Sequence, residues 1–299
     1  MSYHQPVLLS ESIEGLNIVT GGVYVDVTFG GGGHSKEIVK RLSTGKLIAF
    51  DQDADAKANA LPDKNFVLIH SNFSMLLQYL RFYSALPADG ILADLGVSSY
   101  QFDTATRGFS IRFDGPLDMR MDKQTKQTAA HVLKTYNEQQ LQQMFSQNGE
   151  VINSKTLAKC ITAWRTNAFV DSIFAFKEAI ASCVRGANPN DYYAQVFQAL
   201  RIEVNDEMGA LKKFLQQSIE ALKPGGRLVV ISYHSLEDRM VKNIMKCGNV
   251  EGNVIKDFFG NAEQSPFRII SKKPIVPTSE EIKSNSRARS AKLRIAEKK

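Results

Sequence analysis

The stretch Val23-Tyr-Val-Asp-Val-Thr-Phe29, followed by Gly30-Gly-Gly-Gly33 and a helical segment at 34–42, decides the fold. Its first seven residues are β-branched or aromatic at most positions, as in a buried strand. The segment that follows the glycines carries apolar side chains at helical spacing. The order is therefore strand, glycine loop, helix, in which a ligand can approach the backbone closely and meet the amide groups of a helix N-terminus.

The glycine loop does not carry the full dinucleotide fingerprint. In the pattern G-x-G-x-x-G, the third glycine would fall on Ser35 when counted from Gly30, and on Lys36 when counted from Gly31. A nicotinamide cofactor is therefore disfavoured.

Strand-like and helical segments alternate on either side of a long helical block. Further strands are expected at 46–50, 66–69, 90–95, 227–232, 267–271 and 291–295, with helices at 53–60, 73–83 and 203–222. This alternation predicts a parallel, doubly wound α/β sheet. Between about 108 and 197 no strand-like run occurs, and short helices are expected at 128–134, 138–145, 154–165 and 172–183. The sequence thus predicts one discontinuous α/β domain, 1–107 with 198–299, and a mostly helical insert at 108–197.

Composition excludes several classes of protein. The chain has 299 residues, of which 43% are apolar and 23% charged, as in a globular protein with a sizeable core. Three widely spaced cysteines indicate neither a disulfide framework nor a zinc cluster, and we expect no metal. Without a long apolar stretch or a signal-like N-terminus, a membrane span and export are not expected, so the sequence favours the reducing cytoplasm.

The positive charge is concentrated at the C-terminus. The whole chain has 37 basic and 31 acidic residues, and the segment 268–299 alone has ten basic and three acidic ones. The preceding residues therefore carry 27 basic and 28 acidic groups, a net charge of −1. A basic terminal segment suits a phosphate backbone, although a solvated tail is an equal alternative on composition alone.

Chemically useful side chains follow the expected strands. Asp51 ends the second strand 18 residues after Gly33, where a carboxylate can accept hydrogen bonds from ribose hydroxyls; the alternative is a helix cap at Asp51 or Asp53. Asp94 ends the fourth strand and leads into the segment 95–101, which carries hydroxyl and amide groups. Tyr233 and His234 follow the fifth strand, and ligands of open α/β sheets bind along this edge.

Four arginines stand near aromatic residues, a setting that suits a phosphate and a stacked base. Intramolecular ion pairs are the alternative for each of them. The four are Arg107, Arg112, Arg120 and Arg201.

Seven blocks in order resemble the ribosomal RNA small subunit methyltransferase H family. They begin with Thr28-Phe-Gly-Gly-Gly-Gly-His-Ser35, Asp94-Leu-Gly-Val-Ser-Ser99, Arg107-Gly-Phe-Ser110 and Asp114-Gly-Pro-Leu-Asp-Met-Arg-Met-Asp122, and continue with Phe197-Gln-Ala-Leu-Arg-Ile202, His234-Ser-Leu-Glu-Asp-Arg239 and Arg287-Ala-Arg-Ser-Ala-Lys-Leu-Arg294. The resemblance implies a class I methyltransferase, Rossmann-like, that moves a methyl group from S-adenosylmethionine to the N4 amine of a cytidine in bacterial 16S rRNA. It also implies a set of cofactor residues, namely Gly32, Gly33, His34, Asp51, Phe73, Asp94 and Gln101.

Methyl transfer is a direct in-line displacement, so the protein has to align the groups and accept a proton from the amine. As acceptor we expect Asp94 or a hydroxyl of Ser98 or Ser99, with His234 as the competing candidate. For the rRNA of the small ribosomal subunit we expect contacts from the insert and the basic segment. The expected substrate-binding residues are Arg112, Arg120, Arg201, Tyr233, Arg287 and Arg289.

Several alternatives stay open in the sequence. The acceptor could be another nucleic-acid base, or the chain could be a non-catalytic ribosome assembly factor, and a homodimer is neither indicated nor excluded. Truncation after Pro277 is expected to weaken RNA binding and spare the cofactor, provided that the fold survives the loss of its last strand.

Overall fold

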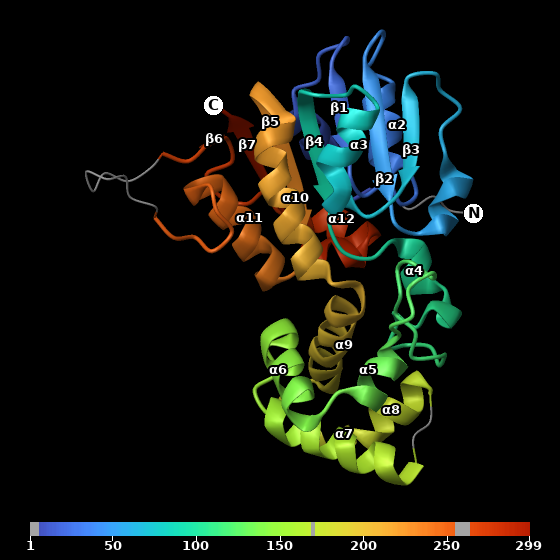
Figure 1. Cartoon of the computed structure of the whole chain (residues 1–299). Coiled ribbons are helices and arrows are strands. Elements are labelled where there is room, and N and C mark those ends of the chain that lie inside the picture. The colour runs from blue at the N-terminus through green and yellow to red at the C-terminus, as the bar shows by residue number, and fades with distance from the viewer. Residues whose placement is uncertain (1–5, 169–170, 255–263) are drawn as a thin grey trace. The chain divides into compact units, whose positions relative to one another are not determined.

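A computed structural model describes residues 6–168, 171–254 and 264–299 of the chain. The chain divides into two compact units, one made of Met1–Gly96 with Met208–Lys299 and the other of Val97–Glu207. Figure 1 shows the first unit as an α/β layer structure and the second as a group of helices. The helical segment expected at 108–197 lies within the second unit, which begins and ends about ten residues outside those bounds.

The first unit is built on a seven-stranded sheet, counted over the described residues. Its order is β3-β2-β1-β4-β5-β7-β6, and β1 to β5 are parallel to one another, while β7 runs antiparallel to β5 and to β6. The strands are β1 (Val23–Asp26), β2 (Lys46–Asp51), β3 (Phe66–His70), β4 (Ala88–Asp94), β5 (Leu222–Ser232), β6 (Phe267–Ile269) and β7 (Lys292–Lys298). Each strand overlaps a segment that the sequence predicted, so the expected α/β fold class is confirmed.

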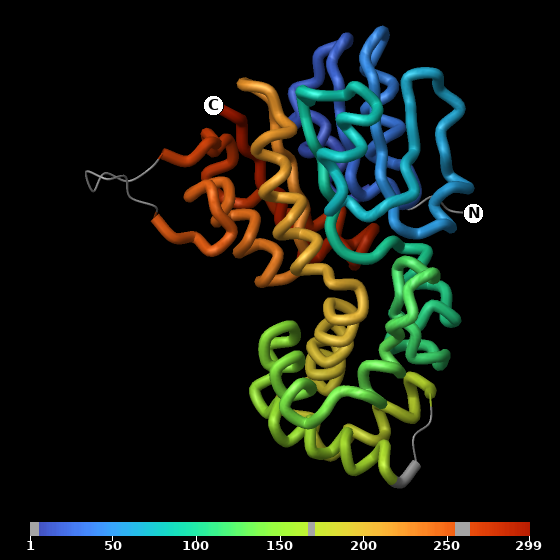
Figure 2. The backbone as a smooth tube through the Cα atoms, viewed as in Figure 1, coloured from blue at the N-terminus to red at the C-terminus, as the bar shows by residue number. Residues whose placement is uncertain are grey.

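Helices cover both faces of this sheet, because successive side chains of the central strands point to opposite faces and are buried on both. Val25, Ile48 and their neighbours pack in one core cluster with α3 (Leu76–Phe82), α10 (Glu207–Ala221) and α11 (Ser235–Cys247). Tyr24, Leu47 and Leu92 face the other way, in a cluster with α1 (Leu9–Leu16) and α2 (Gly33–Val39). Short helical segments complete the unit: η1 (Ala54–Asn59), η2 (Phe73–Met75), α12 (Ser279–Ser284) and η5 (Ser286–Ser290). The tube in Figure 2 shows how its N-terminal and C-terminal segments, blue and orange to red, form this one unit.

The second unit is helical and has its own core, in which Phe145, Phe176 and Leu200 are fully buried. Its elements are α4 (Ser99–Asp103), η3 (Ala105–Arg107), α5 (Ala129–Thr135), α6 (Glu138–Gly149), α7 (Ser154–Ala168), α8 (Ile173–Ala179), η4 (Ala181–Cys183) and α9 (Pro189–Asn205). No helix within the described part of the chain is long and apolar enough to cross a membrane.

The helix expected at 203–222 corresponds to α10, but its expected start was wrong, because residues 203–205 belong to α9. Asp206 adopts a left-handed backbone with φ 48°, which ends α9 at Asn205 and lets α10 begin at Glu207. Amphipathic spacing continues across such a break, so periodicity alone does not reveal it.

Candidate functional site

The glycine loop between β1 and α2 is shaped by backbone that a side chain would disturb. Gly32 has φ 76° in the left-handed region, and a Cβ there would lie 2.9 Å from the Phe29 ring. A Cβ on Gly33 would lie 2.2 Å from Cγ of Pro6. A Cβ on Gly31 would meet no atom within 4 Å, so the loop has open space on that side. The loop therefore offers bare backbone and the N-terminus of α2 to a ligand.

Asp51, at the end of β2, is bonded to this loop. Its Oδ2 accepts the N–H of Gly30 at 2.7 Å and its Oδ1 accepts the N–H of Asp53 at 2.8 Å. Burial raises the pKa of Asp51 to about 6 in spite of these bonds. Asp53, and not Asp51, caps the short helix η1, because its side chain accepts the N–H of Asp55. Since each carboxylate oxygen has two lone pairs, Asp51 retains acceptors for ribose hydroxyls.

Asp94 ends β4 and is held from two sides. The hydroxyl of Tyr233, after β5, donates to Oδ1 of Asp94 at 2.7 Å. The backbone N–H of Asp94 donates to Oγ1 of Thr28 at 2.6 Å, so the backbone at the end of β4 is fixed to the residue that precedes Phe29 and the glycines. Burial raises the pKa of Asp94 to about 6, while the Tyr233 hydrogen bond, and the charge of His34 when its ring is protonated, oppose that shift. About 24% of the Asp94 side chain is exposed, so a substrate group can reach it.

His34 lies in the first turn of α2 and is buried. Its Nε2 lies 3.1 Å from the carbonyl oxygen of Val7, and its Nδ1 lies 3.9 Å from Oδ2 of Asp94. Burial lowers the pKa of His34, although the Asp94 charge and the Val7 carbonyl oppose this. The structure thus brings together His34, Asp94 and Tyr233.

One buried acid of this cluster was missed by the sequence reasoning. Asp26, the last residue of β1, is 1% exposed and accepts the Ser35 hydroxyl at 2.6 Å and the Thr28 N–H at 3.1 Å. Burial raises its pKa. A polar residue inside an otherwise apolar strand was the available signal. Through these two hydrogen bonds, Asp26 connects Thr28, just before the glycine loop, to Ser35 in the first turn of α2.

His234 stands next to Tyr233 but has another role in the structure. It is the N-cap of α11, and its Nδ1 lies 3.4 Å from the N–H of Glu237, while Oε2 of Glu237 accepts the Tyr233 N–H at 2.7 Å. Nε2 of His234 lies 3.1 Å from Oε1 of Glu237. This reciprocal cap fixes the turn that presents the Tyr233 hydroxyl to Asp94.

Phe73 lies just after β3, at the start of η2. Its ring packs edge-on against Phe214 of α10, with centroids 5.5 Å apart and planes at 60°. The side chain is partly buried at the margin of the main core cluster. A partly exposed ring at this position is compatible with the expected contact to adenine.

Ser98 and Gln101 belong to the second unit, where they cap α4 reciprocally. Oγ of Ser98 accepts the N–H of Gln101 at 3.2 Å, and Oε1 of Gln101 accepts the N–H of Ser98 at 3.0 Å. Ser99 is the first residue of that helix. Helix capping therefore accounts for the Ser98 hydroxyl and the Gln101 side-chain oxygen within this unit.

The four arginines that stand near aromatic residues fall into two groups. Arg120 makes a bidentate pair with Asp118, with both N···O distances 2.7 Å, and Arg201 makes one with Glu207 at 2.8 and 3.0 Å. Arg107 is buried and donates to the carbonyls of residues 120 and 121. Arg112, in contrast, is exposed. The ion-pair alternative therefore applies to Arg120 and Arg201.

The basic C-terminal segment is part of the fold. Arg294 pairs with Asp238 at 2.6 Å, and β7 lies between β5 and β6. Arg289 is exposed in η5, and Arg287 is partly exposed beside it. Truncation after Pro277 would remove β7, an interior strand of the sheet, so single substitutions test the contribution of this segment to RNA binding more cleanly.

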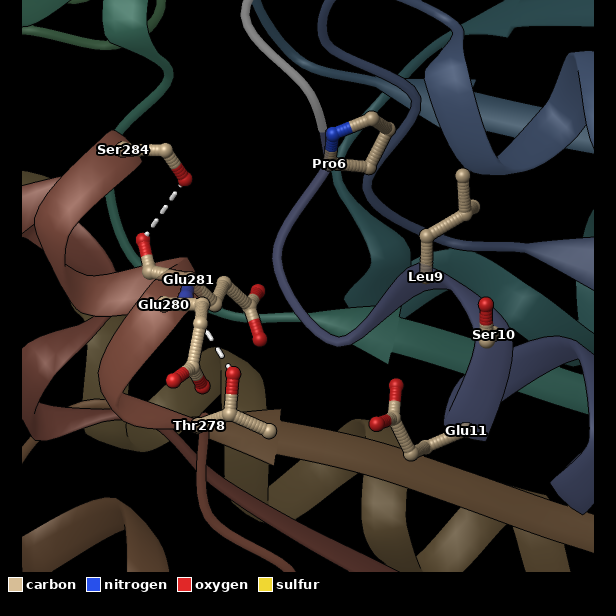
Figure 3. Close-up of a pocket in the computed structure, with 8 residues that line it drawn as sticks. All are labelled: Pro6, Leu9, Ser10, Glu11, Thr278, Glu280, Glu281 and Ser284. Atoms are coloured by element: carbon tan, nitrogen blue, oxygen red, sulfur yellow. Dashed lines mark hydrogen bonds between the residues drawn. The ribbon is translucent and has the colours of Figure 1, made fainter.

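A surface hollow of about 450 Å³ lies between α1 and α12 (Figure 3). Three glutamates line it, together with hydroxyl groups; the lining residues are Pro6, Leu9, Ser10, Glu11, Thr278, Glu280, Glu281 and Ser284. The described lining residues include no basic side chain, so the hollow does not suit a carboxylate or a phosphate.

A mostly parallel sheet with a glycine loop after β1 and carboxylates after β2 and β4 defines the class of Rossmann-like enzymes that bind an adenosine-containing cofactor. The chain belongs to the MraW methylase family, whose sequence model matches residues 1–299. It is thus an S-adenosylmethionine-dependent methyltransferase, as the resemblance of its motifs implied.

Relatives match this chain over its full length. It is 56% identical over 299 residues to the ribosomal RNA small subunit methyltransferase H of Bacteroides fragilis, covering 100% of this chain and 98% of that one. It is 54% identical over 299 residues to the protein of that name from Flavobacterium johnsoniae, with the same coverage. Among solved structures, an rRNA methylase from Streptococcus thermophilus is similar at 13% identity and a TM-score of 0.42, covering 100% and 98% of the two chains.

Proposed function

We propose that this enzyme transfers a methyl group from S-adenosylmethionine to the N4 amine of a cytidine in the decoding region of bacterial 16S rRNA, in the cytoplasm. The observation that carries the proposal is full-length identity of 52–56% to methyltransferases named for small-subunit rRNA. The acid at the end of β4 gives that activity a chemical basis, because an amine that gains a methyl group must lose a proton.

The residues at the sheet edge fit an S-adenosylmethionine molecule. The glycine loop has open space where a Cβ on Gly31 would point, and the carboxylate of Asp51 has unused lone pairs for ribose hydroxyls. When bound, the cofactor supplies an activated methyl group. We assign Gly32, Gly33 and His34 to its methionine end, Asp51 to its ribose and Phe73 to its adenine, with Asp94 and Gln101 completing the site.

Asp94 is assigned as the acceptor of the amine proton. The cytosine N4 lone pair is delocalised into the ring, so an acceptor for its N–H helps to localise that pair as the new bond forms. A carboxyl group whose pKa is about 6 is ionised near neutral pH and is still a better base than an ordinary aspartate. Tyr233 holds Oδ1 by its hydroxyl, which leaves Oδ2 to take the proton.

We assign RNA contacts to the exposed basic residues Arg112 and Arg289 and to Arg287, and we assign substrate recognition to the helical insert. Arg120 and Arg201 are assigned to holding the fold of the insert, because their guanidinium groups face Asp118 and Glu207. The cytidine has to leave its stack to reach the methyl donor, and these contacts offset that cost of a few kcal/mol.

The test is methyl transfer from labelled S-adenosylmethionine to 30S subunits that lack this modification, followed by mass spectrometry of the digested nucleosides. N4-methylcytidine at one site is the expected product. A different methylated nucleoside would show another acceptor base, and no product with intact cofactor binding would support an assembly factor. Asp94→Asn is the control that keeps the side-chain shape and removes the base.

A further inference from the structure

The residues that lead into α1 adopt an unusual backbone. Leu8 is 1% exposed and has φ 49° and ψ 42°, in the left-handed region that leucine rarely adopts. Its N–H donates at 2.8 Å to Oε1 of Glu281, a residue of α12 that lies 273 positions later in the chain. Pro6, two residues before Leu8, packs close to Gly33 of the glycine loop. Glu281 thus ties the N-terminal segment Pro6–Leu8 to the C-terminal part of the first unit.

The same segment determines the state of His34. The carbonyl oxygen of Val7 lies 3.1 Å from Nε2 of His34, and a carbonyl oxygen can only accept a hydrogen bond. Nε2 therefore carries the hydrogen, and in the neutral ring Nδ1 presents a lone pair. That lone pair faces Oδ2 of Asp94 at 3.9 Å.

This orientation favours a protonated Asp94. A hydrogen that arrives on Oδ2 finds an acceptor in Nδ1 of His34, once the two atoms approach by about 1 Å. The other tautomer would place an N–H against Oδ2, which favours the unprotonated carboxylate and weakens it as a base. The titratable groups around Asp94 are Asp26 from β1, His34 from α2, Tyr233 from the turn after β5, and Glu237 from the first turn of α11.

We propose that Glu281 is a positioning residue for methyl transfer. By holding the N–H of Leu8, it keeps the Val7 carbonyl on Nε2 of His34 and so keeps the Nδ1 lone pair directed at Asp94. The inference rests on the proposed function only in taking Asp94 as the proton acceptor. A residue of α12 thereby acts through the backbone of Val7 and Leu8.

Glu280 provides a matched control. It neighbours Glu281 on α12, lines the same hollow and carries the same charge. Figure 3 shows the two side chains diverging from the helix, with Glu281 directed toward the N-terminal segment and Glu280 away from it. Glu281→Gln keeps an oxygen that can accept the Leu8 N–H, whereas Glu281→Ala removes it. Glu281→Met keeps the length of the side chain and replaces the alanine variant if that does not fold.

The first readout is ¹⁵N NMR of the histidine rings in the full chain, which has five histidines. A His34→Gln variant assigns the signals of His34. We expect the Nε2–H tautomer in the wild type, Glu281→Gln and Glu280→Ala, and a mixture of tautomers in Glu281→Ala. An unchanged His34 signal in Glu281→Ala overturns the proposal.

The second readout is methyl transfer to 30S subunits. In Glu281→Ala, kcat should fall on the order of tenfold with KM for the subunit unchanged, and the acid limb of the pH profile should move to lower pH. Glu281→Gln should restore both. A fall in kcat with an unmoved pH profile, or an equal fall in Glu280→Ala, shows a merely structural role and overturns the proposal. If the wild type makes no N4-methylcytidine, the proposed function and the positioning role fail together, and the NMR comparison still decides whether Glu281 sets the tautomer.

Discussion

Replacement of Asp94 with asparagine should abolish methyl transfer and yet stabilise the folded protein at alkaline pH. The carboxyl group is mostly buried, and its pKa is about 6, against an ordinary 3.8. Asparagine keeps an oxygen for the Tyr233 hydroxyl, and its amide nitrogen can donate to the bare Nδ1 of His34. The substitution therefore removes a charge without leaving a buried polar group unpaired.

The magnitude follows from the difference between the folded and unfolded pKa values of Asp94. A raised aspartate pKa means that the folded state is penalised as pH rises, with no penalty well below pH 4 and the full penalty above pH 6. Two pKa units correspond to about 3 kcal/mol, and the 24% exposure of the side chain makes this an upper bound. The gain of the variant should grow from about zero near pH 4 to about 2 kcal/mol at pH 8.

The assay is urea unfolding of both proteins at several pH values, monitored by far-ultraviolet circular dichroism. The free energies of unfolding are compared where the two proteins have equal m-values. Asp114→Asn should change the free energy of unfolding in the opposite direction. Hydrogen bonds from the Phe174 N–H and the Ser172 hydroxyl lower the pKa of Asp114, so its charged form stabilises the folded protein. That variant should lose stability at neutral pH. A difference between wild type and Asp94→Asn that stays constant with pH would refute the reasoning.

Three further predictions concern other parts of the molecule. Tyr233→Phe removes a hydrogen bond that lowers the pKa of Asp94, so the acid limb of kcat/KM against pH should move up by about one unit, and an unmoved limb would contradict this. Gly108→Ala places a Cβ 2.4 Å from the Pro116 carbonyl oxygen at φ 75°, so the melting temperature should fall by several degrees. Gly186→Ala, where φ is 94° and the Cβ meets open space, should lower the melting temperature much less. Arg289→Ala should weaken binding to 30S subunits and lower the salt slope of that binding by about 1; an unchanged slope would remove Arg289 from the RNA contacts.

The strands were predictable because their residues are buried on both faces. Segments such as 46–50 and 227–232 read as continuous β-branched and apolar runs, and parallel strands covered by helices require such runs. The positions of Asp51 and Asp94 at strand ends were predictable for a related reason, and their role in the site stays a prediction that rests on the rule that ligands of these sheets bind where the strands end. The strands follow from the local sequence, and the positions of the two aspartates follow from the rule that ligands of parallel sheets bind at the carboxyl ends of the strands.

The roles of individual polar side chains were less predictable. His234 was a candidate acceptor by its place after β5, and the structure makes it a helix cap, while its neighbour Tyr233 bonds to Asp94. Arg120 and Arg201 were candidates for RNA contact, and each is paired with an acid of its own unit. A side chain reaches several partners from a given backbone position, so its partner depends on atoms contributed by other elements.

The sequence by itself determined the class of fold and the family, because these depend on periodicity and on contiguous motifs. It also placed the candidate cofactor residues after the glycine loop and at the ends of strands. Only the tertiary structure decided how the two ends of the chain meet, with Glu281 bonded to Leu8 and the Val7 carbonyl bonded to His34. It also decided that the carboxyl groups of Asp26 and Asp94 are both buried near one another. That burial raises the pKa of each. The physical reason is that hydrogen bonds and desolvation act over a few ångströms in space, between residues that the sequence places hundreds of positions apart.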